Sequence, residues 1–246
     1  FRLLEGAKNY FPIHFTHQGK VFNPVLPSIP IPIRYTESNF AQYSTMGSHM
    51  ALQIQTLGHW SVQQNGQEVH FSSQSARDLL FYLLSYPEGR SKEDILETLW
   101  KLPPESSSYN RFRVTVHRLR TALGAANSLL EHFGRYHLSP EVLSSSDVYS
   151  FYNGLERGLS ATHASERRVG LDHAIQAYQG DYLPGFNSEW ALEAREEHRS
   201  GYVRARLERA GLNCDSLMCE AAIEDLTLAA ETDPFLGEHH QQELFA

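Results

Sequence analysis

Residues 106–124 read S-S-S-Y-N-R-F-R-V-T-V-H-R-L-R-T-A-L-G, and this stretch decides how the chain folds. Four of its apolar side chains recur at i, i+4, i+7 and i+11, so they share about a 60° sector of a helix that turns by roughly 100° per residue. They are Phe112, Val116, Leu119 and Leu123. One of the serines at 106–108 can cap the start of this helix, and Gly124 suits the position after its end. The spacing predicts an amphipathic helix with one buried face.

The opposite face of this helix is polar and basic. From Tyr109 to Gly124 there are four arginines and no acidic residue. Arginine presents a planar fork that matches guanine edges and phosphates, asparagine pairs with adenine, and threonine or valine meets the methyl group of thymine. We therefore predict a helix that binds the major groove of DNA through Asn110, Arg111, Val114, His117, Arg118 and Thr121, with Arg113 on its flank. The alternative is a solvated basic face, which is the usual meaning of a run of charge.

The segments around this helix predict a winged helix-turn-helix. Polar and apolar residues alternate through 52–71 on either side of Asn65-Gly66, and these two residues accept the positive φ angles of a tight hairpin turn. A helix follows at 76–84, and a capping box at 91–94 begins a second one. Residues 129–138 have the pattern of another hairpin, the wing. A wing of this kind places a basic or polar tip on the minor groove or the phosphates, and Arg135 is expected at or near it.

These segments resemble a known family of regulators. The motifs L-Q-I-Q-T-L-G-H-W-S-V at 52–62, S-A-R-D-L-L-F-Y-L-L at 75–84, N-R-F-R-V-T-V-H-R-L-R-T-A-L-G at 110–124 and G-R-Y-H-L at 134–138 resemble the OmpR-type winged-helix domain of SARP-type bacterial activators. The motifs D-V-Y-S-F at 147–151, A-I-Q-A-Y-Q-G-D-Y-L-P-G-F at 174–186 and A-A-E-T-D-P-F at 229–235 resemble the bacterial transcriptional activator domain that accompanies it. The resemblance implies a transcription factor whose third helix and wing contact DNA and whose second domain is a tetratricopeptide-like helical array.

The second half of the chain has its own helical pattern. Apolar residues recur at helical spacing in 165–179, 189–211 and 218–232, while Cys214 and Cys219 fall in a stretch that reads as a loop. The fold class is therefore mainly α with small β-hairpins, a winged helix-turn-helix domain over 51–145 and a tetratricopeptide-like α-helical array over 146–246. We expect the array to stop at Ala246, short of its last helices.

The first fifty residues are of a different kind. They contain five of the eleven prolines, and V-L-P-S-I-P-I-P-I at 25–33 disfavours both helix and central strand. Residues 46–50 read M-G-S-H-M, as a cleaved affinity tag does. We interpret residues 1–50 as a linker or as fusion- or tag-derived sequence. The alternative is a peptide that docks as an extended strand.

The two domains differ in how charged residues are distributed along the chain, which the net charge of −8 does not reveal. Residues 51–145 contain nine Lys or Arg and nine Asp or Glu, whereas residues 146–246 contain eight and eighteen. The second domain is thus a poor ligand for a polyanion, and the positive charge of the first is concentrated on one helix.

Several other kinds of protein are excluded or disfavoured. A chain of 246 residues with 41% hydrophobic and 20% charged residues is globular, and it contains no apolar run of membrane-spanning length and no secretion signal. Two cysteines cannot form a disulfide framework or a cysteine-built zinc site, so a cytoplasmic protein is expected. His239-His240 cannot easily chelate one ion from a helix, and nucleotide and acyl-transfer motifs are missing. We expect no enzymatic activity, cofactor, metal or membrane partner.

Two functions remain. The first is a sequence-specific regulator of transcription that binds double-stranded DNA, an activator whose helical domain serves dimerisation on repeated sites, regulation or contact with RNA polymerase. The second is a protein-interaction module in which the helical array binds a partner and the winged helix is a docking platform. An acid-free basic face on the third helix favours the first.

Overall fold

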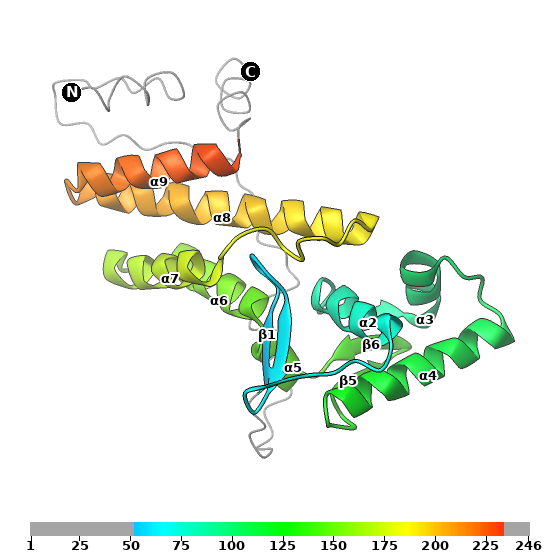
Figure 1. Ribbon diagram of the computed structural model, residues 1–246. Coiled ribbons are helices and arrows are strands. Elements are labelled where there is room, and N and C mark those ends of the chain that lie inside the picture. The colour runs from blue at the N-terminus through cyan, green and yellow to red at the C-terminus, as the bar shows by residue number, and fades with distance from the viewer. Residues whose placement is uncertain (1–51, 234–246) are drawn as a thin grey trace. The chain divides into compact units, whose positions relative to one another are not determined.

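The computed structural model describes residues 52–233 (Figure 1), so the predictions for residues 1–50 and for His239-His240 lie outside the described residues. The described chain forms two compact units. The winged-helix unit consists of residues 52–153 and Ala177–Arg195, and the helical unit consists of Gly154–Gln176 and 196–233. These units do not coincide with the predicted division at residue 145, because segments beyond it fold with the winged helix.

The winged-helix unit begins with a small antiparallel sheet in the order β1-β2-β3. Its strands are β1 (Leu52–Gln55), β2 (Ser61–Gln64) and β3 (Gln67–Glu68), and Ile54 is opposite Val62. Asn65 and Gly66 join β2 to β3 with φ angles of 53° and 76°, as the predicted tight turn requires. The first predicted hairpin is therefore confirmed.

Three helical segments follow: α2 (Gln74–Leu84), α3 (Lys92–Asp94) continued by the π-helical turn η3 (Ile95–Leu99), and α4 (Ser106–Ala122). The predicted capping box is confirmed, since Ser91 and Asp94 each bond the backbone of the other. The predicted serine cap of α4 is wrong. Glu105 is the capping residue, because its backbone is already extended (φ −132°, ψ 170°), and the three serines lie inside the first turn.

The apolar stripe of α4 is buried as predicted. Phe112, Val116, Leu119 and Leu123 are each at most 7% exposed, and α4 packs against α2. Gly124 follows the helix with φ 65°, and the backbone N–H of Ala125 bonds the carbonyl of Arg120. This is the expected helix end, in which a residue of left-handed conformation satisfies the last carbonyls.

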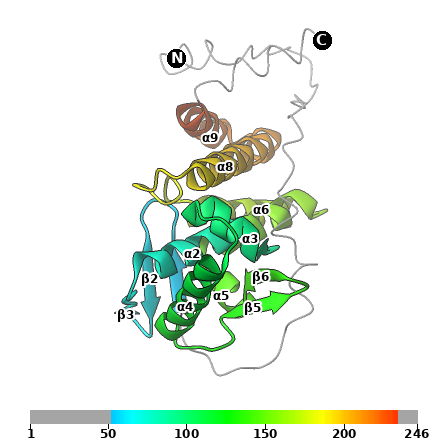
Figure 2. The ribbon, with the colours of Figure 1, turned by 90° about the vertical axis from the view of Figure 1, so that its right-hand side faces the viewer.

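The wing is the hairpin of β5 (Leu129–His132) and β6 (Arg135–Leu138), which confirms the second predicted hairpin. A short strand, β4 (Arg90–Ser91), pairs with β6 and completes a sheet in the order β4-β6-β5. Figure 2 shows the hairpin beside α4. The rings of Phe112 on α4 and Tyr136 on β6 meet edge to face with centroids 4.8 Å apart, which sets the wing against the helix.

Segments beyond residue 145 complete the winged-helix unit. After α5 (Pro140–Ser144), the carboxylate of Asp147 accepts bonds from the backbone N–H groups of Thr56 and Leu57 at 2.7 and 2.8 Å. Arg195 donates to the backbone carbonyls of Tyr182, Leu183 and Phe186 at 2.8 to 2.9 Å. Residues 147–153 and 177–195 therefore fold with the winged helix, which is why the compact units and the predicted domains differ.

The helical unit contains parts of α6 (Asp147–Ser160), α7 (Ala164–Ala177) and α8 (Glu189–Asp215), and all of α9 (Cys219–Thr232). Gly158 on α6 and Gly170 on α7 bring the two backbones together, since a methyl group at either position would overlap the other helix. Val203 and Leu207 of α8 pack on Ala229 of α9. The predicted array of helix pairs is confirmed. Cys214 and Cys219 are not in a loop as expected but near the end of α8 and at the start of α9.

Candidate nucleic-acid interface

The exposed face of α4 contains the residues that the sequence singles out on this helix. All seven are exposed, and Val114 retains 41% of its accessible surface. They are Asn110, Arg111, Arg113, Val114, His117, Arg118 and Thr121. Phe112 and Thr115 lie between them in the sequence but are buried, as the helical period requires. The helix thus presents a polar, basic surface and no acidic side chain from Tyr109 onward.

Several polar side chains of this face make no hydrogen bond within the described residues, Arg118 and Asn110 among them. Within residues 52–233, neither the guanidinium of Arg118 nor the amide of Asn110 makes a hydrogen bond, and Arg118 makes no ion pair. An arginine without an internal partner keeps its five N–H donors for an external acceptor such as a phosphate or a guanine edge. Arg118 is therefore available to an external acceptor, as is Arg113, which is also exposed and makes no hydrogen bond or ion pair within the described residues.

Arg111 is held in place by neighbouring elements. Its guanidinium carbon lies 5.5 Å from the centre of the Trp100 ring, and its Nη2 donates to Ser75 Oγ near the start of α2 at 3.4 Å. A cation over an aromatic face gains a modest electrostatic stabilisation. These contacts restrict the side chain, so Arg111 is oriented before any ligand arrives.

The hydroxyl of Thr121 is used inside the helix. Its Oγ1 donates to the carbonyl of His117 at 2.9 Å. An exposed threonine whose hydroxyl bonds the preceding turn offers its methyl group to the surroundings. This suits an apolar contact, such as the methyl of thymine, better than a hydrogen bond to a base.

Arg120, on the flank of α4, joins the helix to the wing. Its Nη2 donates to the carbonyl of Leu129 at 2.7 Å. The side chain is only half-buried, but this bond connects the last turn of α4 to the first residue of β5. Arg120 is one of the four arginines between Tyr109 and Gly124. The structure gives it the role of positioning the hairpin.

Arg135 lies at the first residue of β6, within the wing as expected, and its side chain is directed back into the protein. Its Nη2 donates to the carbonyl of Gly89 at 2.5 Å, and its Nε lies 3.4 Å from the carbonyl of Glu88. Gly89 has φ 80°, which turns this loop toward β6. Part of the Arg135 donor capacity is therefore committed to the loop before β4. Its contact with DNA stays a prediction.

The tip of the wing is formed by Phe133 and Gly134, and sequence reasoning did not single out Phe133. The Phe133 side chain is 91% exposed, and the ring of His132 lies 4.2 Å from it. Glu131 Oε1 accepts a bond from the backbone N–H of Gly134 at 3.1 Å. The signal in the sequence is the dipeptide Phe-Gly at a position where a two-residue hairpin turn prefers Asn-Gly.

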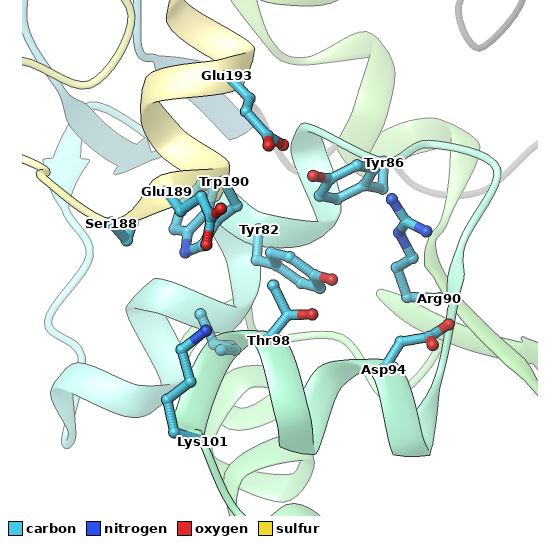
Figure 3. A pocket seen from close by; sticks show the side chains of 11 residues that line it. Tyr82, Tyr86, Arg90, Asp94, Thr98, Lys101, Ser188, Glu189, Trp190 and Glu193 are labelled. Atoms are coloured by element: carbon cyan, nitrogen blue, oxygen red, sulfur yellow. The ribbon is translucent and has the colours of Figure 1, made fainter.

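A separate hollow of about 370 Å³ lies inside the winged-helix unit (Figure 3). Tyr82 on α2 faces Trp190 on α8, with ring centroids 5.5 Å apart, and the guanidinium of Arg90 lies 3.7 Å from the centre of the Tyr86 ring. Burial raises the pKa of Tyr82 despite the opposing hydrogen bond from Thr98, so its phenol is neutral at pH 7. These contacts hold the start of α8 against α2. The hollow opens at the surface of the unit, where exposed residues such as Lys101, Glu189 and Glu193 line it.

Side chains that could ligate a metal are dispersed over the described part of the chain. Between residues 52 and 233, no group of three or more His, Cys, Asp or Glu side chains is arranged to hold a metal ion. No helix in that part of the chain is both long and apolar enough to cross a membrane.

The fold and the exposed helix define a class: a winged helix-turn-helix joined to an array of helix pairs. No protein-family model matches the chain, and no curated protein does. Among solved structures, it is similar to EmbR of Mycobacterium tuberculosis, determined in complex with a low-affinity phosphopeptide. The two are 18% identical with a TM-score of 0.50 over 76% of this chain and 56% of the EmbR chain. The likeness shows the fold, and this chain spans little more than half of the EmbR structure.

Proposed function

We propose that this chain is a transcriptional regulator of the SARP type, an activator that binds a specific sequence in double-stranded DNA by placing α4 in the major groove. The observation that carries the proposal is the exposed face of α4. It combines the three exposed arginines Arg111, Arg113 and Arg118 with the absence of acidic residues from Tyr109 to Gly124, while the opposite face is buried. Alternation of both signs of charge is typical of a solvent-exposed helix face stabilised by salt bridges, and this face lacks the acidic partners.

The side chains on this face fit different parts of a duplex. Arg118 and Arg113 supply charge for phosphates or guanine edges, and Asn110 supplies the amide that pairs with adenine. Val114 and Thr121 supply apolar contacts, and His117 lies between them on the helix. Arg111 and Arg135, which already contact the protein, fit backbone positioning better than base recognition because their orientation is restricted.

The helical domain would act on partners other than DNA. Residues 146–246 contain eighteen acidic and eight basic residues, so they repel a polyanion. Arrays of helix pairs form surfaces that hold protein segments. We assign dimerisation on repeated DNA sites, regulation or contact with RNA polymerase to this domain, and DNA binding to residues 51–145.

The test begins with the whole chain and a random library of duplexes, from which bound sequences are selected and then titrated by fluorescence polarisation. Arg118→Glu should weaken binding to the selected site by about tenfold or more, since a good base or phosphate contact is worth roughly 1–3 kcal/mol. Arg157→Glu is the matched control, because Arg157 is an exposed arginine on α6 and its substitution changes the net charge by the same amount. Its affinity should be nearly unchanged.

Salt dependence separates this function from the interaction module. The logarithm of the binding constant should fall with the logarithm of salt by about 0.9 per phosphate contacted, and Arg118→Glu should reduce that slope by about one contact. Equal weakening by both glutamate variants would remove α4 from the interface. A folded chain that selects no duplex at low salt would contradict the proposal and favour the protein-interaction module.

A further inference from the structure

The tip of the wing breaks the sequence rule for its turn. Phe133 and Gly134 join β5 to β6 with φ angles of 49° and 76°, and His132 pairs with Arg135 across the turn. Such turns prefer Asn or Gly at the first position, because a positive φ brings the Cβ atom of other residues too close to the backbone. A bulky aromatic residue is unfavourable there. Phe133 therefore weakens the hairpin that it closes.

Phe133 does not recover this cost by packing. Its side chain is 91% exposed, and its one ring contact within the described chain is with the adjacent His132. Burial of apolar area is the main stabilisation that a phenylalanine contributes to folding, and here that stabilisation is absent. A residue that is strained and exposed at once is a candidate for function, since the folded chain alone does not account for it.

The surroundings of the tip show what it can meet. The hairpin is fixed beside α4 by the Arg120 bond to Leu129 and by the contact of Phe112 with Tyr136. Arg135, the nearest cation, is bonded to the loop before β4, and Glu131 is bonded to the turn itself. The tip therefore presents an aromatic ring. This ring stands among the exposed polar side chains of Glu131, His132 and Arg135.

We propose that Phe133 enters the minor groove next to the major groove occupied by α4 and wedges between two base pairs, so that the DNA is kinked where the wing meets it. This inference rests on the proposed DNA binding. Apolar side chains that insert between base steps unstack them and bend the duplex. The exposed apolar surface at the tip is one side chain at the end of a braced hairpin, whereas a docking site for a protein needs a broader patch. An isolated ring at that place fits a base step.

The experiment uses the whole chain and the duplex selected from the random library. Energy transfer between dyes at the two ends of the duplex measures bending, and 2-aminopurine placed in turn at each flanking position reports local unstacking. The wild-type chain should shorten the end-to-end distance and raise 2-aminopurine fluorescence at one step beside the α4 site. Because easily unstacked pyrimidine–purine steps lower the cost of a kink, that step should be of this kind.

The decisive variant is Phe133→Asn, with Phe133→Trp as the rescue. Asparagine relieves the turn, so the melting temperature should stay the same or rise while the bend and the 2-aminopurine signal disappear. Affinity should fall by about tenfold or less, because the favourable insertion of the ring is partly offset by the cost of unstacking the bases. Phe133→Trp should keep the bend.

The outcomes separate this inference from the proposed function. Weak binding by Arg118→Glu together with an undistorted wild-type complex would leave DNA binding in place and overturn the wedge. A bend that persists in Phe133→Asn would overturn it as well, as would a Phe133→Asn variant that loses only contact with RNA polymerase. A wild-type chain that binds no duplex would overturn both.

Discussion

The hydroxyl group of Tyr182 lies 3.0 Å from that of Ser85, although 97 residues separate them in the sequence and both side chains are buried. The same phenol donates to the carbonyl of Phe81 at 3.2 Å, and complete burial raises its pKa far above the usual range. The phenol is thus neutral and hydrogen-bonded at pH 7. This contact joins the segment after α7 to the end of α2.

Tyr182→Phe should lower the free energy of unfolding by about 1–3 kcal/mol, because removing the hydroxyl leaves buried polar groups with fewer partners. Denaturant unfolding measures the change. The control is Tyr109→Phe, which removes an exposed hydroxyl bonded to Glu93 at 3.2 Å. That variant should stay within about 0.5 kcal/mol of the wild type. Equal losses in the two variants would argue against a special role for the buried bond.

Asp225 is the second position with a large expected effect. It is fully buried on α9 and accepts bonds from Arg206, from Arg209 through two nitrogens, and from Asn213, at 2.6 to 3.1 Å. Asp225→Asn leaves the two arginines without their shared negative partner. We expect a loss of about 3–5 kcal/mol in the free energy of unfolding, as for other broken buried ion pairs.

Asp172→Asn is the matched control for Asp225→Asn, since Asp172 also pairs with Arg209, at 2.7 Å, but its side chain is 51% exposed. An exposed pair contributes little, so this variant should lose less than about 1 kcal/mol. A large loss from Asp172→Asn and a small one from Asp225→Asn would reverse the ranking and refute the assignment.

Two glycines in the helical unit should respond to alanine substitution with opposite changes in stability. A methyl group added at Gly170 would lie 2.8 Å from the carbonyl oxygen of Gly154, so Gly170→Ala should push α7 away from α6 and cost about 1–3 kcal/mol. A methyl group at Gly211 of α8 meets nothing within 4 Å. Gly211→Ala should therefore stabilise the helix by about 0.5–1 kcal/mol. Thermal unfolding followed by circular dichroism shows both directions.

Two neighbouring positions on α4 should separate folding from recognition. Phe112 is 2% exposed and Val114 is 41% exposed. Phe112→Ala should cost about 3–5 kcal/mol of stability, as large truncations in a core do. Val114→Ala should leave the melting temperature nearly unchanged while shifting the selected DNA sequence at one position, since an apolar contact to thymine is lost. An unchanged site preference for Val114→Ala would place that residue outside the base-reading surface.

Elements whose signals are local could be predicted from the amino-acid sequence. The stripe of Phe112 and Val116 repeats at the helical period, Asn65-Gly66 supplies the positive φ angles of its turn, and the capping box at 91–94 needs only a three-residue spacing. Each signal depends on residues that are neighbours in the chain. For the same reason the acid-free face of α4 is recognisable in the amino-acid sequence, because helical periodicity alone separates it from the buried face.

The way in which distant segments combine could not be predicted from the sequence. Asp147 and Tyr182 belong to the winged-helix unit because they bond Thr56 and Ser85, contacts that span 91 and 97 residues and leave no periodic trace in the sequence. The directions of long side chains could not be predicted from the sequence either. Arg120 and Arg135 are committed to backbone carbonyls brought near by the fold, whereas Arg118 makes no hydrogen bond within residues 52–233. A sequence pattern states on which face a residue lies, but the acceptors within reach of a flexible guanidinium depend on packing.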